Sequence, residues 1–345
     1  MQCLAQRAKS TTALHKVFNT SIISLLSRYQ ARHFSVSYTN KSLKPIPFLP
    51  SWDANIFAEK ACNPGLPYRL PRSKAHIPPA CDKWFTHDND AGFVILDEGI
   101  DDHDKVHIPE SSELRSSFWT EHGSTIVPLE LTTSKSSADA VNATKDKHGE
   151  EFHRAEAPLS LLLAYLSSKS PSPPVSIYLA QCDLSTLPAS LQRDIPLPSL
   201  LDPTSTSGVI KGDIYASSLW LGRAPTYTPL HRDPNPNFFM QLAGRKRIRL
   251  LPPAVGDAVF ADVQRQLGAS DSPTLRGEEM MVGPQREALD DAVWGTGTQY
   301  AEMLDTYGAE TVLGLGDALF VPRGWWHSVK GVGDGVTASV NWWFR

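Results

Sequence analysis

Two histidines and one aspartate have residue types and a spacing that suit metal binding. In His231-Arg232-Asp233 an imidazole and a carboxylate stand two positions apart, and on an extended chain this spacing points both side chains to one face of a sheet. Alone the triplet is a weak signal, because a buried histidine hydrogen-bonded to an aspartate is the commoner origin of such a pattern. A third ligand is available at His327, where a strand passes through a tight turn and presents histidine at the start of the next strand.

The elements that must hold these three side chains are predicted to be strands. From about Ser217 onward the chain consists of short β segments separated by turn residues, which favours an antiparallel barrel or sandwich. Two histidines and one carboxylate on a barrel rim form the facial triad of non-haem iron(II) oxygenases, which leaves three coordination positions open. The predicted strands are Leu219–Gly222, Asn237–Leu242, Arg247–Leu251, Ala318–Val321, His327–Lys330 and Val336–Phe344.

One lysine in this region is predicted to point into the barrel. Alternation puts Arg245, Arg247 and Arg249 on one face of their strand and Lys246 on the other, beside Ile248 and Leu250. A buried ammonium without a partner costs several kcal/mol or loses its proton. We therefore expect an anion inside the barrel, and a dicarboxylate cosubstrate would fit.

The last predicted strand has one polar face. Thr337, Ser339 and Asn341 alternate there with Val336, Ala338 and Val340. That face suits either the wall of a hydrated metal cavity or a side exposed to solvent, and the alternation does not choose between them.

Upstream segments are predicted less sharply. Phe93–Leu96 and Ile126–Leu129 are expected to be short strands, and Thr133–Lys147 is expected to be a loop. An apolar helix is predicted after Pro158.

Several of these segments together resemble the JmjC-type 2-oxoglutarate oxygenases. The resemblance rests on Tyr227–Pro253, Gly316–His327 and Val340–Trp343, with Tyr178–Gln181 matching a motif upstream of the triad. It is strongest with the small hydroxylase branch, which includes the asparaginyl hydroxylase of hypoxia-inducible factor and the JmjC arginyl hydroxylase. It implies a mainly β fold with flanking helices, the double-stranded β-helix or jelly-roll of the cupin-like JmjC barrel.

The resemblance also implies a cofactor and its ligands. It implies iron(II) held by His231, Asp233 and His327, with O2 and 2-oxoglutarate as cosubstrates and succinate and CO2 as products. The far carboxylate of 2-oxoglutarate would be held by Lys246 with Thr228 and Tyr178. Asn237 and Asn341 would line the same pocket.

The chain divides into three parts by composition. Residues 1–44 hold seven basic residues and no acid, and a basic, serine- and threonine-rich start with apolar residues at helical spacing predicts a mitochondrial targeting segment over residues 1–40. A disordered basic tail is the alternative. Residues 41–84 are rich in proline and predict an extended N-terminal wrap. Residues 85–345 form the predicted catalytic domain, with a barrel core at 215–345 and an insertion or lid at 254–309.

Charge and motif content make some classes of partner and site less favoured than others. Without residues 1–44 the chain has 26 basic against 37 acidic residues, and the insertion has ten acids against three bases. These charges disfavour nucleic acid and favour a protein or peptide substrate. No apolar run reaches the roughly 18 residues of a membrane-spanning helix. Four cysteines without a CxxC pair give neither a disulfide framework nor a zinc ribbon.

The sequence therefore predicts an Fe(II)- and 2-oxoglutarate-dependent dioxygenase of the mitochondrial matrix that hydroxylates a protein side chain. Demethylation of histone or protein lysine and hydroxylation of a tRNA base remain open as activities. A non-catalytic cupin-like binding module and a nuclear or cytoplasmic location also remain open. The sequence does not decide the oligomeric state or the point of presequence cleavage.

Overall fold

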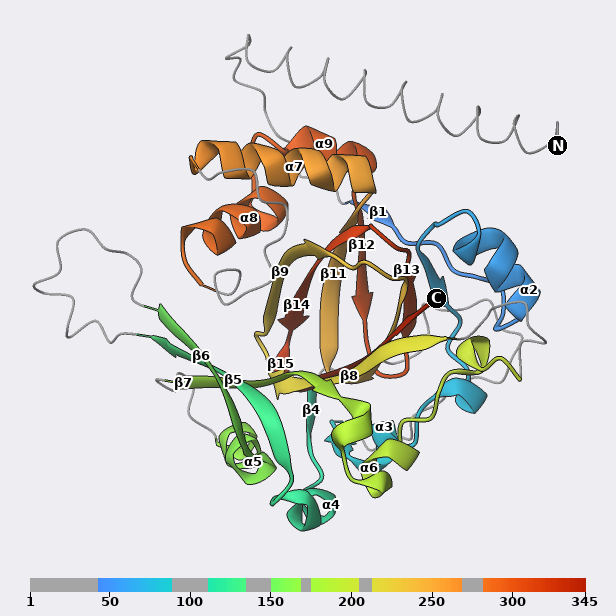
Figure 1. The fold of residues 1–345 in the computed structure, drawn as a ribbon, viewed down its shortest axis with the longest axis vertical. Helices are drawn as coiled ribbons and strands as arrows, with labels where there is room; N and C mark the ends of the chain where they lie inside the picture. The colour runs from blue at the N-terminus through green and yellow to red at the C-terminus, as the bar shows by residue number, and fades with distance from the viewer. Residues whose placement is uncertain (1–42, 89–110, 135–149, 169–174, 205–212, 269–281) are drawn as a thin grey trace, which may run out of the picture.

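A computed structural model describes residues 43–88, 111–134, 150–168, 175–204, 213–268 and 282–345 (Figure 1). The strands are β1 Lys44–Pro45, β2 Tyr68–Leu70, β3 Phe85–His87, β4 Ser111–Leu114, β5 Ile126–Ser134, β6 Glu150–Pro158, β7 Val175–Asp183, β8 Ile214–Arg223, β9 Tyr227–Arg232, β10 Asn237–Ala243, β11 Arg245–Leu251, β12 Ala309–Leu313, β13 Ala318–Val321, β14 Trp326–Val332 and β15 Asp334–Phe344. The helices are α2 Ala54–Phe57, α3 Ala80–Lys83, α4 Ser116–Trp119, α5 Leu159–Ser167, α6 Ala189–Arg193, α7 Pro253–Gln266, α8 Pro284–Trp294 and α9 Ala301–Tyr307.

Two sheets face each other and enclose the site. The smaller has the order β1-β12-β11-β14-β9, and the larger follows β2-β13-β10-β15-β8-β7-β5-β6. From β8 onward the chain crosses repeatedly between them, since β8, β10, β13 and β15 lie in the larger sheet and β9, β11, β12 and β14 in the smaller. No ladder joins the two sheets over the described residues, so this cupin-like fold is a jelly roll rather than a closed barrel. The predicted fold class is confirmed.

Side-chain alternation decides what each sheet face carries. Phe238, Met240 and Trp342 of the larger sheet point outward into the main core, where helices and N-terminal segments cover them. Their neighbours in the alternation point between the sheets, where Phe239 packs with Ile248 and Leu319 in a second apolar cluster. The space between the sheets thus has an apolar end and, beside it, the polar groups of the site.

The strands predicted from Leu219 onward all lie within observed strands: β8, β10, β11, β13, β14 and β15. Ile126–Leu129 begins β5, and the apolar helix is α5. The predicted loop at Thr133 was placed too early, because Thr133 and Ser134 still pair with β6. Phe93–Leu96 lies outside the described residues. The strands β6, β7, β9 and β12, and the short strands β1 to β4, were not among the predicted strands.

The N-terminal segment is only partly an extended wrap. Short strands β1 and β2 add to the edges of the two sheets, but α2 and a π-helical turn at Ala58–Cys62 form where prolines are absent, between Pro50 and Pro64. Asp53 caps α2 by accepting a hydrogen bond from the Ile56 amide. The prediction was wrong there, because proline prevents helix locally rather than across a whole segment.

The insertion between β11 and β12 contributes α7, α8 and α9. Their apolar side chains, among them Val259 and Leu289, form a separate cluster against Leu230, Leu251 and Trp326 on the outer face of the smaller sheet. Figure 1 shows these helices together at one end of the jelly roll. They therefore support the smaller sheet, which carries His231 on β9 and His327 on β14 and whose strand β9 ends directly before Asp233.

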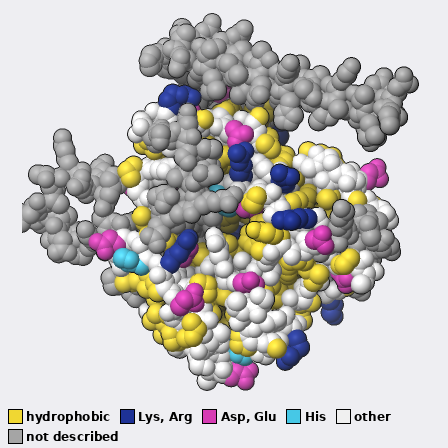
Figure 2. All heavy atoms as spheres, viewed as in Figure 1, with side chains coloured by type: hydrophobic (Ala, Val, Ile, Leu, Met, Phe, Trp, Pro, Cys, Tyr) yellow, Lys and Arg dark blue, Asp and Glu magenta, His cyan; other side chains and the backbone are white. Residues whose placement is uncertain are grey.

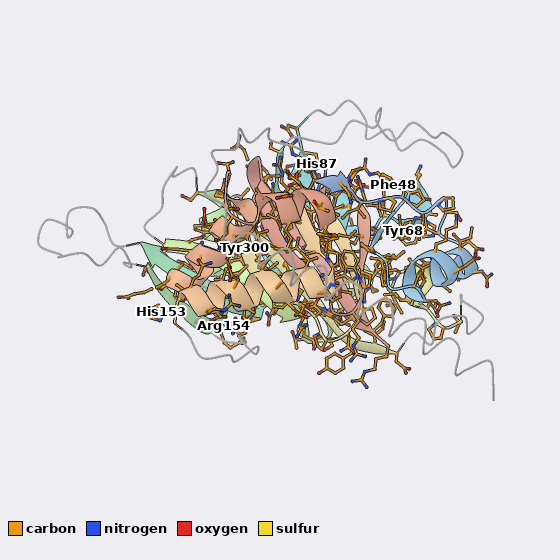
Figure 3. The ribbon with its side chains drawn as sticks, turned by 90° about the horizontal axis from the view of Figure 1, so that it is seen from above. Phe48, Tyr68, His87, His153, Arg154 and Tyr300 are labelled. Carbon is orange, nitrogen blue, oxygen red and sulfur yellow. The ribbon has the colours of Figure 1, made fainter. Side chains whose placement is uncertain are left out.

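The described surface carries charges of both signs, and the N-terminal segment and strand β6 lie at opposite sides of the molecule. On the face shown in Figure 2, basic and acidic side chains are interspersed over the described surface. Seen from above, Phe48 and Tyr68 of the N-terminal segment lie on the side opposite His153 and Arg154 of the edge strand β6 (Figure 3). Among the described helices, none is both long and apolar enough to cross a membrane.

Candidate metal centre

The structure brings His231, Asp233 and His327 together between the sheets. One ligand atom from each lies within 4.8 Å of the others. His231 and His327 are register partners across β9 and β14, and their ring centroids are 4.1 Å apart. The Nε2 atom of His327 lies 3.6 Å from Oδ2 of Asp233. The alternative of a histidine simply hydrogen-bonded to an aspartate does not explain why a second imidazole faces the same point.

Both imidazoles are oriented by backbone carbonyls. Nδ1 of His231 lies 2.8 Å from the Pro229 carbonyl oxygen, and Nδ1 of His327 lies 3.2 Å from that of Trp325. A carbonyl only accepts, so Nδ1 carries the proton in each ring and Nε2 is left with a free lone pair. Burial, together with the nearby His231, lowers the pKa of His327 to about 4. The ring is neutral at physiological pH, as a metal ligand must be.

A chain of amides orients the carboxylate. Asn341 donates from Nδ2 to Oδ1 of Asn237 at 2.8 Å, and Asn237 donates from Nδ2 to Oδ2 of Asp233 at 2.9 Å. Burial by itself would raise the pKa of Asp233, but the two histidines and hydrogen bonds from Trp343 and Asn237 together lower it. The carboxylate is thus held ionised, with strand β15 fixing its direction through β10.

This donor set fits a divalent transition metal with open positions. Two neutral imidazoles and one carboxylate are the ligands of the facial triad of non-haem iron(II) sites. Each ligand is oriented by an outer partner, as metal ligands usually are. Within the described residues this is the one group of histidine, cysteine and acidic side chains close enough to hold a metal ion.

Lys246 lies at the closed end of the same space. Its residue is 3% exposed, as the alternation of β11 predicts. The ammonium donates to Oγ of Ser339 at 2.7 Å and lies 3.4 Å from the hydroxyl of Tyr178. Among the described residues no carboxylate forms an ion pair with it, and burial lowers its pKa to about 7. This is an environment that an anionic ligand would complete.

The polar face of β15 is the wall of this interior. Thr337, Ser339 and Asn341 are all at most 5% exposed, and Gln241 donates to the Thr337 hydroxyl at 3.0 Å. The alternative of a solvent-facing side is therefore wrong. The reason is tertiary, because β15 lies in the middle of the larger sheet with β10 and β8 on its two sides.

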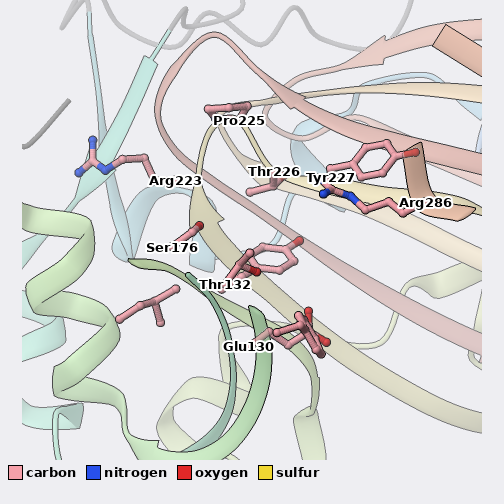
Figure 4. Close-up of a pocket in the computed structure, with 11 residues that line it drawn as sticks. Glu130, Thr132, Ser176, Arg223, Pro225, Thr226, Tyr227 and Arg286 are labelled. Carbon is pink, nitrogen blue, oxygen red and sulfur yellow. The ribbon is translucent and has the colours of Figure 1, made fainter. Parts of the chain in front are cut away.

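Tyr178 reaches the lysine because a glycine leaves room for its ring. A Cβ atom at Gly222 of β8 would lie 2.4 Å from a ring carbon of Tyr178, closer than real side chains approach. On its other side the tyrosine borders a cavity of about 220 Å³. Glu130, Thr132 and Ser176 lie on one side of that cavity, opposite Tyr227 and Arg286 (Figure 4).

The remaining predicted residues are placed as follows. Asn341 donates to Asn237, and Asn237 donates to the ligand Asp233. That these two asparagines line the cosubstrate pocket remains a prediction. For Thr228 the structure gives a backbone contact, its carbonyl accepting from Oγ of Ser328 at 2.9 Å. A cosubstrate role for its hydroxyl remains a prediction.

Three site residues were missed from the sequence. Ser339 was placed on a polar face but not recognised as the partner of Lys246. Trp343 was not predicted as a site residue, yet a hydrogen bond from its side chain helps to lower the pKa of Asp233. The ring of Trp220 lies 6.1 Å from that of Tyr178 between centroids, and its buried Nε1 has no hydrogen-bond partner among the described residues. The sequence feature that could have identified Ser339 and Trp343 is side-chain alternation, because both share one face of the last strand with Asn341.

Comparisons with known proteins agree with this geometry. The chain matches the family described as cupin-like domain over residues 94–345. It is 28% identical over 184 residues to "Lysine-specific demethylase JMJ30" of Arabidopsis thaliana, covering 53% of this chain and 37% of that protein. It is 31% identical over 168 residues to "Jumonji C domain-containing protein 5" of Drosophila melanogaster, covering 48% and 36%. Against "Lysine-specific demethylase 8" of Xenopus tropicalis it is 28% identical over 167 residues, covering 48% and 32%. The matched region spans about a third of the length of each of these relatives.

Proposed function

The chain belongs to the cupin-like domain family, and from this premise we propose that it is an Fe(II)- and 2-oxoglutarate-dependent oxygenase that hydroxylates a protein side chain. The observation that carries the proposal is the pairing of two features in one interior. One is a triad of two histidines and an aspartate with ligand atoms within 4.8 Å of one another. The other is a buried lysine without an acidic partner among the described residues.

The separation of the two features suits a short diacid. His327 is the register partner of Leu250, four residues from Lys246 along β11, which is about 13 Å of strand. The extended lysine side chain spans part of that distance, and a five-carbon oxo acid is long enough to span the remainder. One end of 2-oxoglutarate would meet the metal, and the other would meet Lys246, Tyr178 and Ser339.

The residues of the chain have separable tasks. A metal held by the triad would supply O2 activation coupled to oxidative decarboxylation of 2-oxoglutarate. His231 and His327 would bind it through Nε2, while their Nδ1–H groups donate hydrogen bonds to backbone carbonyls. Lys246 neutralises the far carboxylate in a dry environment, where a charge-assisted hydrogen bond is strong. Its pKa of about 7 means that anion binding above pH 7 is accompanied by proton uptake on this amine.

Anaerobic titration tests the proposal directly. Fe(II) and 2-oxoglutarate added together should give the weak visible absorption of the chelate, whereas either alone should not. Asp233→Ala should abolish the band at any cosubstrate concentration, and Lys246→Met should shift it to much higher 2-oxoglutarate. A wild-type protein that stays colourless with both would refute the oxygenase and favour the non-catalytic binding module.

Lysine demethylation is the second candidate, because two of the relatives above carry that activity in their names. Hydroxylation and demethylation use the same metal and cosubstrate residues, so the product separates them. Mass spectrometry of proteins from cells with and without the gene would show a single-oxygen difference for hydroxylation. A methyl difference, accompanied by formaldehyde release in vitro, would support demethylation instead.

We also propose that the protein acts in the mitochondrial matrix on a protein or peptide. The support is in the sequence, in the acid-free basic segment at residues 1–40. A tagged full chain should colocalise with mitochondria, and a chain lacking residues 1–40 should not. Nuclear signal from both forms would count against the matrix.

A further inference from the structure

One metal ligand lies on an edge strand, and a second directly follows that strand. β9, which carries His231 and ends at Arg232 just before Asp233, is the edge strand of the smaller sheet, and among the described residues it pairs with β14 alone. The register shifts between Thr228 and His231, opposite His327 and Val329 of β14, so an irregular pairing directly precedes the ligands. A one-residue slip of such a strand would turn both ligands away from the interior. The ligand end of β9 therefore needs support from outside the ladder.

That support comes from the helical insertion. Arg232, between the two ligands, and Trp326, directly before His327, are register partners whose side chains leave the outer face of the sheet. Both donate to one oxygen of Asp257 on α7, Arg232 from Nη1 at 2.7 Å and Trp326 from Nε1 at 3.0 Å. A single carboxylate oxygen thus ties both ligand-bearing strands together at the level of the ligands.

The residues around Asp257 pack α7 directly against the indole ring of Trp326. A Cβ atom at Gly256 would lie 2.1 Å from the Trp326 ring, so the helix backbone rests directly on the indole. Phe260, one turn later, packs on the same ring at 5.1 Å between centroids. The Arg232 guanidinium lies 5.2 Å from the ring centroid as well. The indole, which precedes a ligand in sequence, is thereby held by α7 and by β9 together.

We propose that Asp257 is a positioning residue of the metal centre, which sets the geometry of His231, Asp233 and His327 through Arg232 and Trp326 without touching the metal. The inference rests on the proposed function, since it needs a metal at the triad. Asp257 and Arg232 are half-exposed, at 50% and 40%, and an ion pair of that exposure adds little to global stability. Its effect should therefore appear in metal affinity rather than in unfolding.

Mn²⁺ binding to the full chain, followed by the loss of the free-ion electron paramagnetic resonance signal, tests the proposal. Asp257→Ala should raise the dissociation constant about 10-fold, the lower end of the range for outer partners of metal ligands. Asp257→Asn keeps an acceptor oxygen in the same place and should stay within about threefold of wild type. Asp291→Ala removes an equal charge from the exposed side of the neighbouring helix α8 and should leave Mn²⁺ affinity unchanged.

Two further variants keep the test sharp if Asp257→Ala folds poorly. Arg232→Met removes the guanidinium and keeps the aliphatic stem, and Trp326→Phe removes the indole N–H together with part of the ring that packs on α7. Each should weaken Mn²⁺ binding about threefold. Affinities of all these variants within twofold of wild type would overturn the proposal, as would equal losses for Asp257→Ala and Asp257→Asn. A wild-type chain that binds no Mn²⁺ would instead refute the metal centre and with it the proposed function.

Discussion

Replacing Lys246 by methionine should make the ligand-free protein more stable while removing its cosubstrate affinity. Methionine has a similar length and no charge, so it leaves little cavity. The folded-state pKa of Lys246 is about 7 against 10.5 for a free lysine side chain. The unfolded chain therefore binds the proton more tightly, and the amine costs stability. This cost is complete below about pH 7 and disappears as the pH rises towards 10.5.

The magnitude follows from the size of that shift. A difference of 3.5 pKa units corresponds to about 5 kcal/mol at low pH, from 1.36 kcal/mol per unit. At pH 7.5 about 4 kcal/mol of it remains, and at pH 9.5 about 1.5 kcal/mol. Losing the hydrogen bond to Ser339 offsets about 1–3 kcal/mol at either pH. The gain in unfolding free energy from Lys246→Met should thus fall by about 2.5 kcal/mol between these two pH values.

Urea unfolding of the metal-free full chain, followed by tryptophan fluorescence at pH 7.5 and 9.5, measures this difference. Lys60→Met, at an exposed position, is the matched control. Its difference in unfolding free energy from the wild type should be the same at both pH values. With Mn²⁺ present throughout, addition of 2-oxoglutarate should raise the urea midpoint of the wild type and leave that of Lys246→Met unchanged. An unfolding free-energy difference that is the same at both pH values would refute the buried, unpaired ammonium on which the anion-binding argument depends.

Three other substitutions separate the metal from the cosubstrate. Asp233→Ala should weaken Mn²⁺ binding by more than about 100-fold, because it removes a ligand, and isothermal titration measures it. Asn341→Ala should weaken Mn²⁺ about 10-fold by releasing Asn237 from the carboxylate, and an unchanged affinity would show that the amide chain does not orient Asp233. Gly222→Ala should push the ring of Tyr178 away and weaken 2-oxoglutarate binding about 10-fold with Mn²⁺ affinity intact. Loss of both affinities together would point to general misfolding of β8.

The pattern of strands near the site could be predicted because alternation acts locally. Lys246 among outward arginines on β11 is inward for the same stereochemical reason in any sheet, and the structure places it there. His231 and Asp233 share a face because they are two residues apart. His327 was proposed as the third ligand from its position at the start of a predicted strand, and the resemblance of three segments to JmjC oxygenases added the identity of the anion, which spacing alone could not supply.

The hydrogen bonds that orient Lys246 and Asp233 join chain segments that are far apart in sequence. Ser339 meets Lys246 across 93 residues, and Asn341 meets Asn237 across 104 residues. No local pattern encodes such pairings, because they follow from which strands become neighbours. The same holds for the polar face of β15, whose exposure was undecidable until β8 and β10 were seen to flank it.

The sequence by itself determined the residue types of the centre, the inward face of β11 and the β-rich fold class, because side-chain periodicity and ligand chemistry are local properties. Only the tertiary structure decided that α7–α9 buttress the ligand strands from outside, that Trp343 donates to Asp233, and that Gly222 admits Tyr178. These depend on how surfaces distant in the chain pack, and packing is fixed by the whole set of neighbours at once.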